Sequence, residues 1–464
     1  MPDKRQRLCA IPAMDIILNY DWVQDWQAKL GRTRLKREIN RELSSVRTRI
    51  LSDEGFEFSA EEFRNACLSA FADASRPSLR RVINATGVVI HTNLGRSLIA
   101  PAAVEAMTQA AQYYSNLEYD LKAGTRGQRI SHVEELLCSL TGAEASLVVN
   151  NNAGAVMLAL SALAKGSEVV VSRGELVEIG GSFRIPDIMS LSGAVLTETG
   201  TTNRTHLYDY ERAITERTAM LLKVHPSNFR IEGFTTAPDR KELARLARER
   251  GLIFMEDLGS GLMVDGEVIG LPHSSDEISI KASLESGANI VTFSGDKMLG
   301  GPQIGGIVGR KKYIDLLKKH PMTRALRCDK VTLAGFEATL RLYAQGLYDD
   351  IPTLRMLRLS PETLKACADS LAETLSQRLS AEVRVLEVND ATGGGSCPEI
   401  PLKGWGVSVK HETLGAGQIQ RALRGCDVPV LCGAKDDELV LHVRTLQEGE
   451  ADILAEALGG VLNA

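Results

Sequence analysis

The sequence predicts an α/β protein with a mostly parallel sheet, preceded by a helical segment and followed by a smaller α+β segment. Two observations predict this class. Short runs rich in β-branched residues alternate with helical stretches through the middle of the 464-residue chain, as in parallel sheets covered by helices on both faces. The first part of the chain instead carries apolar residues at helical spacing. We therefore expect three domains: 1–80, 81–330 and 331–464.

The N-terminal segment predicts two helices. Residues 29–50 hold eight Lys or Arg against two Glu, and Leu35, Ile39 and Leu43 recur at helical spacing. This is the pattern of an amphipathic helix with a basic face. Such a face is either solvated or binds tRNA, and the pattern alone does not decide between them. A second helix is expected over 60–74, ending before an Arg-Pro pair.

Short apolar runs in the middle of the chain predict the strands of the sheet. Their residues are 145–150, 168–172, 194–199, 219–224, 252–257, 289–294 and 305–310. Helical patterns separate most of them, as at 239–249 and 276–285. From about Thr332 the chain is helical through Tyr343. Strands are then expected at 382–388, 406–410 and 438–444, and this part predicts a second, smaller domain.

Composition excludes several classes of protein. The chain is 44% hydrophobic and 24% charged with a net charge of −5, which is ordinary for a globular protein. Its eight cysteines form no C-x-x-C pair, which favours reduced thiols over a disulfide framework or a structural zinc site. No run approaches the roughly 20 apolar residues that span a bilayer. We expect a cytoplasmic protein with no membrane segment and no metal.

Polar clusters follow six of the predicted strands, where ligands of open α/β sheets bind. They lie at 150–155, 172–181, 200–203, 225–228, 257 and 294–297. One such cluster is common in any α/β protein. Because six follow six strands, we expect a functional site at this edge of the sheet.

The first cluster predicts a phosphate site. Asn152, Ala153 and Gly154 stand where a strand leads into a helix, and backbone N–H groups at a helix start attract anions. The cluster is neither G-x-G-x-x-G nor a P-loop, which weakens nucleotide interpretations. An asparagine-rich helix cap without a ligand explains the same residues.

Asp257 and Lys297 supply the other parts of a cofactor site. Asp257 ends a strongly apolar strand, where a carboxylate needs a cationic partner such as a pyridinium nitrogen; a helix cap or a metal are the alternatives. Lys297 follows Ser294 in a glycine-rich loop, and a solvated lysine in a turn is its plain alternative. The phosphate site at Asn152–Gly154 (the phosphate cup), Asp257 and Lys297 occur along the chain in the order found in fold-type I pyridoxal phosphate enzymes. We expect Lys297 to bond covalently to the cofactor and Ser294 to help hold its phosphate.

The sequence resembles one family along nearly its whole length: bacterial selenocysteine synthase, or L-seryl-tRNA(Sec) selenium transferase. The resemblance rests on many stretches in the same order. They include VINATGVVIHTNLGRS (82–97), NLEYDL (116–121), GTRGQR (124–129), VVNNNAGAV (148–156), KVHPSNFRIEGFT (223–235), FSGDKMLGGPQ (293–303) and RALRCDKVTLAGFEATLRLY (324–343).

The resemblance implies roles for individual residues. Lys297 matches the lysine that holds pyridoxal 5'-phosphate, and Arg96, Arg324 and Arg327 match arginines that bind the anionic selenium donor, selenophosphate. Arginine side chains suit such oxyanions, although a salt bridge at a helix end would explain Arg324 and Arg327 equally well. His225 is a candidate contact of the cofactor ring, and a structural histidine after a strand is the alternative.

The resemblance also implies the reaction. Seryl-tRNA(Sec) would lose water to give an aminoacrylyl-tRNA, and selenium from selenophosphate would add to it to give selenocysteinyl-tRNA(Sec). In this family the N-terminal domain binds the tRNA, and the subunits form a homodecamer, a pentamer of dimers. We expect these partners and this assembly here.

Two other interpretations remain at this point. Proteins that resemble this core include pyridoxal phosphate-dependent ammonia-lyases of phosphorylated amino sugar acids, but a small-molecule lyase does not need the basic N-terminal helix. A non-catalytic tRNA-binding protein would be expected to have lost Lys297 or Asp257, and both are present.

Overall fold

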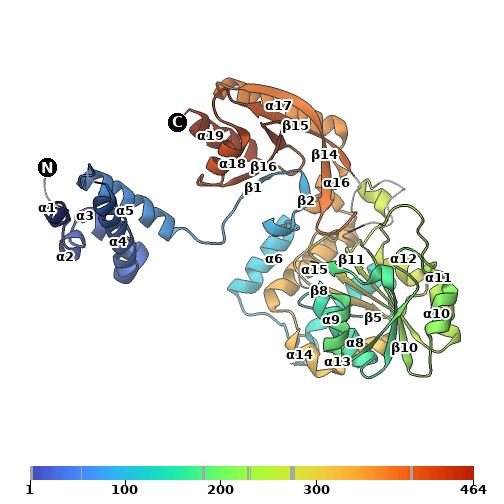
Figure 1. The fold of residues 1–464 in the computed structure, drawn as a ribbon. Helices are drawn as coiled ribbons and strands as arrows, with labels where there is room; N and C mark the ends of the chain where they lie inside the picture. Colours follow the sequence, from blue (N-terminus) through green and yellow to red (C-terminus); the bar gives the residue numbers. More distant parts are fainter. Residues whose placement is uncertain are drawn as a thin grey trace. The chain divides into compact units, whose positions relative to one another are not determined.

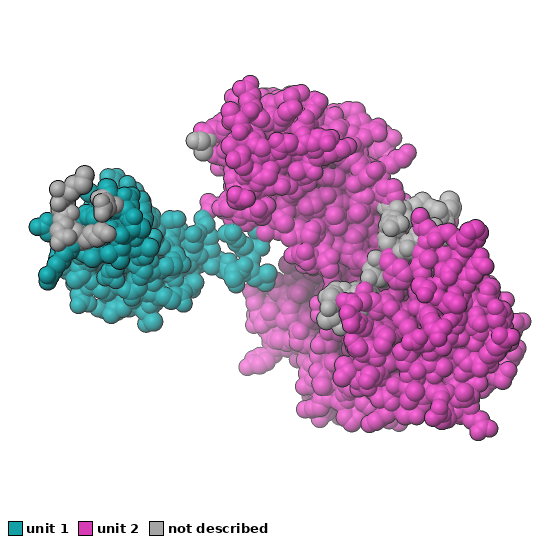
Figure 2. Space-filling view, viewed as in Figure 1, with its two compact units in different colours: residues 1–81 teal, residues 82–464 magenta. Residues whose placement is uncertain are grey.

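The computed structural model describes residues 4–53, 55–179, 183–226, 229, 231–271, 277–397 and 401–463. The chain divides into two compact units, Met1–Arg81 and Val82–Ala464, which Figure 2 shows in different colours. The expected boundary between 330 and 331 stays a prediction.

Unit 1 is helical. Its helices are α1 (Lys4–Cys9), α2 (Met14–Ile17), α3 (Asp21–Gln24), α4 (Gln27–Ser52) and α5 (Ala60–Ser75). Leu35, Ile39 and Leu43 of α4 are buried against apolar residues of α5, which is the amphipathic packing that their spacing predicts. Gly31 has a left-handed φ of 71° and kinks α4 near its start. The expected helices at 29–50 and 60–74 are therefore confirmed.

The basic residues of α4 lie mostly on its exposed side. The exposed residues are Lys29, Arg32, Arg34, Arg37, Arg41, Arg47 and Arg49. Glu38 is buried and accepts ion pairs from Arg37 at 3.0 Å and Arg41 at 2.9 Å. The other exposed arginines keep this face strongly positive.

Unit 2 contains a seven-stranded sheet in the order β5-β13-β12-β11-β10-β6-β9. Figure 1 shows this sheet with helices around it. The strands are β5 (Ala145–Val149), β6 (Glu168–Ser172), β9 (Val195–Thr199), β10 (Thr218–Val224), β11 (Ile253–Gly259), β12 (Ile290–Ser294) and β13 (Gly305–Gly309). Only β13 is antiparallel to its neighbours in this sheet. The seven strands expected from the sequence are the seven observed.

Helices cover both faces of this sheet. The helices around it are α6 (Pro101–Gln112), α7 (Glu134–Thr141), α8 (Asn152–Leu163), α9 (Ile185–Ser192), α10 (Leu207–Ala213), α11 (Arg240–Glu249), α12 (Ile280–Glu285), α13 (Lys311–Lys319), α14 (Pro321–Ala325), α15 (Lys330–Gln345) and α16 (Pro352–Arg358). Alternate strand residues enter two separate apolar cores. Val170 belongs to the core that includes residues of α6, α7, α11, α12 and α15, and Val171 belongs to the core that includes residues of α8, α9 and α13. Two buried faces explain why the strands are almost continuously apolar.

A second, six-stranded sheet has the order β1-β16-β17-β15-β14-β2. Its elements are β1 (Ile83–Ala85), β2 (Val88–Ile90), β14 (Glu382–Gly393), β15 (Leu402–Lys410), β16 (Val430–Lys435) and β17 (Glu438–His442), with α17 (Pro361–Arg378), α18 (Ala416–Leu423) and α19 (Glu450–Leu462) packed against it. Strands β1 and β2 pair with β16 and β14, so the start of unit 2 lies within the C-terminal sheet.

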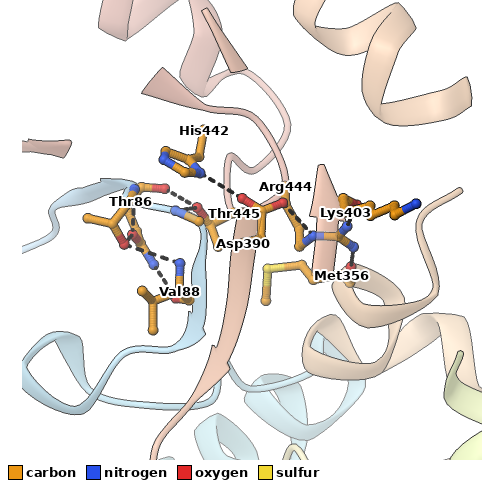
Figure 3. Close-up of polar contacts among 10 residues, drawn as sticks. Thr86, Val88, Met356, Asp390, Lys403, His442, Arg444 and Thr445 are labelled. Carbon is orange, nitrogen blue, oxygen red and sulfur yellow. Dashed lines mark hydrogen bonds and ion pairs between the residues drawn. The ribbon is translucent and has the colours of Figure 1, made fainter. Parts of the chain in front are cut away.

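A buried ionic network holds this sheet to its neighbours (Figure 3). The carboxylate of Asp390 accepts hydrogen bonds from His442 Nδ1 and Arg444 Nε, both at 2.7 Å. Arg444 also donates to the carbonyls of Met356, at 2.8 Å, and Lys403, at 2.6 Å. The network therefore joins three strands of the sheet to helix α16.

The turn between β1 and β2 packs against the same network. Thr445 Oγ1 donates to the carbonyl of Asn84 at 2.6 Å. Gly87 has a φ of 74°, and a Cβ there would lie 2.2 Å from Asp390 Oδ1. Any side chain at position 87 would collide with the buried carboxylate, so the turn requires glycine.

Candidate active site

Lys297 lies in the loop after β12, at the carboxyl ends of the parallel strands. Its side chain is buried. Burial lowers its pKa, and the nearby charge of Arg96 lowers it further, while Asp257, Asp296 and Glu277 act in the opposite direction. The net shift favours the neutral amine, which is the form that can attack an aldehyde.

The glycines around Lys297 allow the loop to pack closely. A Cβ at Gly295 would lie 2.5 Å from Ile304 Cγ1, and one at Gly300 would lie 2.4 Å from Ile351 Cγ2. Ser97 Oγ donates to the carbonyl of Lys297 at 2.5 Å. The loop is therefore fixed by packing and by hydrogen bonds, which is not the environment of a solvated lysine in a turn.

Asp257 lies on β11, beside the strand that leads to Lys297. It is buried, and Oδ1 accepts hydrogen bonds from Asn152 Nδ2 at 2.8 Å and Thr292 Oγ1 at 3.0 Å. Burial raises its pKa, and the two hydrogen bonds and the charge of Lys297 oppose this rise only in part. A positively charged ring nitrogen would offset the cost of burying this carboxylate.

The predicted phosphate cup is the start of α8. Asn151 caps this helix by accepting the N–H of Gly154 at 2.8 Å, so the N–H of Gly154 is already engaged. The N–H groups of Asn152 and Ala153 are in the first turn, where a helix offers no internal acceptor. Asn152 Oδ1 is buried and finds no hydrogen-bond partner within the described residues. An additional polar group at this point would satisfy it.

Strand β13 brings the cup close to the end of β12. Gly305 pairs with the buried Ser294, and a Cβ at Gly305 would lie 2.1 Å from the carbonyl oxygen of Asn151. The structure thus places the cup, Ser294, Asp257 and the loop of Lys297 around the ends of adjacent strands. These residues fit pyridoxal phosphate, because the cup suits its phosphate, Asp257 its ring nitrogen and Lys297 its aldehyde.

His225 follows β10 and faces a carboxylate that the sequence analysis did not single out. Its backbone N–H donates to the carbonyl of Asp257 at 2.9 Å, and its Nε2 lies 3.4 Å from Glu277 Oε1. Glu277 Oε1 also accepts the N–H of Cys397 at 3.0 Å. Burial raises the pKa of Glu277, but the hydrogen bond and charge of His225 and the Cys397 N–H outweigh it, so the pKa is lowered.

Glu277 could not be found by strand-end reasoning, because it lies shortly before helix α12 and not at the end of a predicted strand. The last two residues of the cluster at 225–228, Ser227 and Asn228, lie outside the described residues. Glu277 and His225 therefore form the described part of this side of the site.

Arg96 lies next to the lysine loop. It has a φ of 65°, and its Nη1 donates to Asp296 Oδ2 at 2.7 Å. Asp296 directly precedes Lys297, so Arg96 contributes positive charge beside the lysine. The backbone N–H of Ser97 donates to the carbonyl of Asp296 at 3.3 Å, which ties the segment after β2 to this loop.

Arg324 and Arg327 lie together in a separate pocket of about 450 Å³. The described residues that line it also include Arg126, Arg129, Lys318 and Lys319, but not Arg96. The N–H of Asn150 donates to the carbonyl of Leu326 at 2.8 Å, so this pocket borders the segment that forms the cup. Within one chain the three predicted arginines are thus not gathered at one point.

Fold and site together define a pyridoxal phosphate-dependent enzyme of fold type I. The structure of a D-glucosaminate-6-phosphate ammonia-lyase has the same fold, with a TM-score of 0.58 at 22% sequence identity, over 83% of this chain and 96% of the other.

Sequence comparison then identifies the family. The family model for L-seryl-tRNA selenium transferase matches residues 82–447, and that for the selenocysteine synthase N terminus matches residues 10–47. The L-seryl-tRNA(Sec) selenium transferase of Desulfotalea psychrophila is 48% identical over 91% of both chains. That of Caldanaerobacter subterraneus is 46% identical over 97% of both chains. The chain belongs to the L-seryl-tRNA selenium transferase family.

Among the described residues, no three His, Cys, Asp or Glu side chains are grouped so that they could hold a metal ion. None of the described helices is both long enough and apolar enough to cross a membrane.

Proposed function

We propose that the chain converts seryl-tRNA(Sec) to selenocysteinyl-tRNA(Sec) with selenium from selenophosphate. The observation that carries this proposal is a buried Lys297 beside Asp257, in a chain related along nearly its full length to proteins named for this reaction. Bound pyridoxal phosphate supplies an electron-accepting ring that stabilises negative charge on the Cα of an attached amino acid.

Lys297 is the proposed proton carrier of the reaction. Its amine would hold the cofactor before the seryl group arrives and would then be free to take the proton from the seryl Cα. The lowered pKa supports this role, since a base must be largely unprotonated before it can accept a proton. Ser97 binds the backbone carbonyl of Lys297 and does not engage its amine.

Asp257 and the cup would orient the cofactor. The carboxylate of Asp257 would pair with the ring nitrogen, and Thr292 and Asn152 fix that carboxylate. The first-turn N–H groups at Asn152 and Ala153 would bind the phosphate. His225, braced by Glu277, is the proposed contact of the ring or the substrate.

The arginines are the proposed binding groups for the selenium donor. Arg324 and Arg327 line a pocket rich in cations, and Arg96 lies beside Lys297. Guanidinium groups bind phosphate-type oxyanions through paired N–H donors. Arg96 and the pair Arg324 and Arg327 could act on one donor if a second subunit completes the site.

Self-association is supported by exposed apolar side chains. Tyr113, Tyr114 and Leu121 are 62%, 106% and 73% exposed, and they lie close together in sequence after α6. Such residues commonly mark an interface between subunits. We propose a homo-oligomer, with the decamer as the expected size, to be checked by light scattering.

Unit 1 is the proposed docking site for the tRNA. The exposed arginines of α4 would contact the backbone phosphates of the tRNA, and such contacts act through charge and do not read the base sequence.

All eight cysteines are free thiols, which supports a reducing compartment such as the cytoplasm.

The test uses purified full-length chain loaded with pyridoxal phosphate, seryl-tRNA(Sec) and ⁷⁵Se-labelled selenophosphate. After deacylation of the tRNA, labelled selenocysteine is the expected product, and the Lys297→Ala variant should yield none. Recovery of serine alone from protein that binds the cofactor would contradict the proposal. Phosphorylated amino sugar acids would then be the next substrates to try.

A further inference from the structure

The pocket around Arg324 and Arg327 contains far more positive than negative charge. Its lining brings together the hairpin of β3 (Tyr119–Asp120) and β4 (Thr125–Arg126), the end of α13 and helix α14. Six of the described lining residues are Lys or Arg: Arg126, Arg129, Lys318, Lys319, Arg324 and Arg327. The carboxylate among the described lining residues is that of Glu118, and Lys318 is paired with Glu134, which lies outside the lining. A pocket with this balance attracts anions.

Glu118 is bound by three of these arginines at once. Its carboxylate accepts Arg129 Nε at 2.7 Å, and it lies 3.3 Å from both Arg126 Nη2 and Arg327 Nη1. The hydrogen bond from Arg129 lowers the pKa of Glu118, so the group is ionised at neutral pH. The side chain remains 30% exposed, so water and solutes can reach it.

Other contacts would keep the pocket in place without Glu118. Arg129 Nη1 donates to the carbonyl of Cys328 at 2.8 Å, which fixes its guanidinium independently. Arg324 and Lys319 make no ion pair with any residue that the structure describes. They leave positive charge that Glu118 does not neutralise.

We propose that Glu118 is an exchangeable counter-ion of this pocket and that it competes with the phosphate-type anion already proposed to bind Arg324 and Arg327. The N–H groups of Arg126, Arg129 and Arg327 that now hold Glu118 are those a tetrahedral oxyanion would use. The ligand must therefore displace the carboxylate, or bind beside it against charge repulsion. Either way Glu118 weakens binding of the anion and speeds its release.

This inference rests on the proposed function and extends it, because the selenium donor of that function is a phosphate-type anion. It assigns Arg126 and Arg129 to the anion pocket together with Arg324 and Arg327. It gives Glu118 the role of setting how long the anion stays bound.

The experiment is calorimetric titration of inorganic phosphate into the full-length protein loaded with pyridoxal phosphate. The cofactor's own phosphate then fills the cup at α8, so the titration reports the second pocket. The Glu118→Gln variant should bind phosphate about tenfold more tightly, since removing one charge a few ångströms from the ligand is an effect of this order. The Arg126→Gln variant should bind it more weakly.

Glu144→Gln is the matched control. Glu144 is also an exposed glutamate paired with an arginine, Arg310 at 2.6 Å, and it does not line the pocket. Phosphate affinity should not change in this variant. Equal or weaker binding by Glu118→Gln would overturn the counter-ion role, and no loss in Arg126→Gln would overturn the assignment of the pocket. Neither result depends on selenium transfer, so failure of the proposed function would be seen separately.

Discussion

Replacing Arg444 with methionine removes the cation that balances the buried carboxylate of Asp390. Arg444 is 3% exposed, and its guanidinium also binds the carbonyls of Met356 and Lys403. The variant would leave Asp390 with the hydrogen bond from His442 and would remove a donor from two carbonyls. Breaking a buried pair in this way costs about 3–5 kcal/mol of unfolding free energy.

Tryptophan fluorescence can isolate the sheet that this change affects. Of the three tryptophans, Trp22 and Trp26 lie in unit 1 and Trp405 lies on β15. In a chain with Trp22→Phe and Trp26→Phe, urea unfolding followed by fluorescence reports the C-terminal sheet. Arg444→Met should lower the urea midpoint strongly.

Arg378→Met is the control for this experiment. Arg378 ends α17 in the same part of unit 2, and its pair with Asp452 at 3.1 Å is exposed. Its loss should change stability by no more than about 0.5 kcal/mol. Adding Asp390→Asn to Arg444→Met should recover part of the lost stability, because the unpaired charge is then absent. If Arg444→Met lowered the unfolding free energy no more than Arg378→Met, the network around Asp390 would not be what stabilises the sheet.

Three further predictions concern the site and unit 1. Lys297→Ala should lose the covalently held cofactor, as measured by mass spectrometry after borohydride reduction. If the variant still carried the mass of the cofactor, Lys297 would not be the residue that holds it. The melting-temperature difference between the native protein and Glu277→Gln should be largest above pH 4.5 and should narrow as pH falls, because a carboxylate with a lowered pKa no longer stabilises the fold once it is protonated. A difference that stays constant with pH would contradict the pair of Glu277 with His225. Removing residues 1–81 should weaken tRNA binding and reduce the salt dependence of that binding, while cofactor binding persists. An unchanged tRNA affinity would mean that the basic face of α4 is only solvated.

Much of the fold could be predicted from the sequence, because its strands are buried on both faces. Runs such as 168–172 and 289–294 contain consecutive apolar residues that do not alternate with polar ones, as in Val169–Val171 and Ile290–Val291, and the observed β6 and β12 begin and end within a residue of them. Strands β1 and β2 could not be predicted. They have three residues each, and their partners lie hundreds of residues later in the chain.

The candidate site was predictable where it depends on strand ends. Asp257 lies near the end of β11 and Lys297 follows the neighbouring β12, and the carboxyl ends of parallel strands meet at one edge. Glu277 and Glu118 were not predictable, since their partners are brought to them by loops and turns that carry no periodic signal. The separation of Arg96 from Arg324 was likewise visible only in three dimensions.

The position of β1 and β2 has a consequence for how the protein is made. Ile83 pairs with Val430, so the C-terminal sheet cannot be completed until about 350 further residues have been synthesised. At ribosomal rates of about 5–20 residues per second, this delay is roughly 20 to 70 s. The segment that carries Arg96 to the lysine loop follows β2 directly, so its anchoring waits as well. Capture of the cofactor should therefore be a late event, after translation is nearly finished.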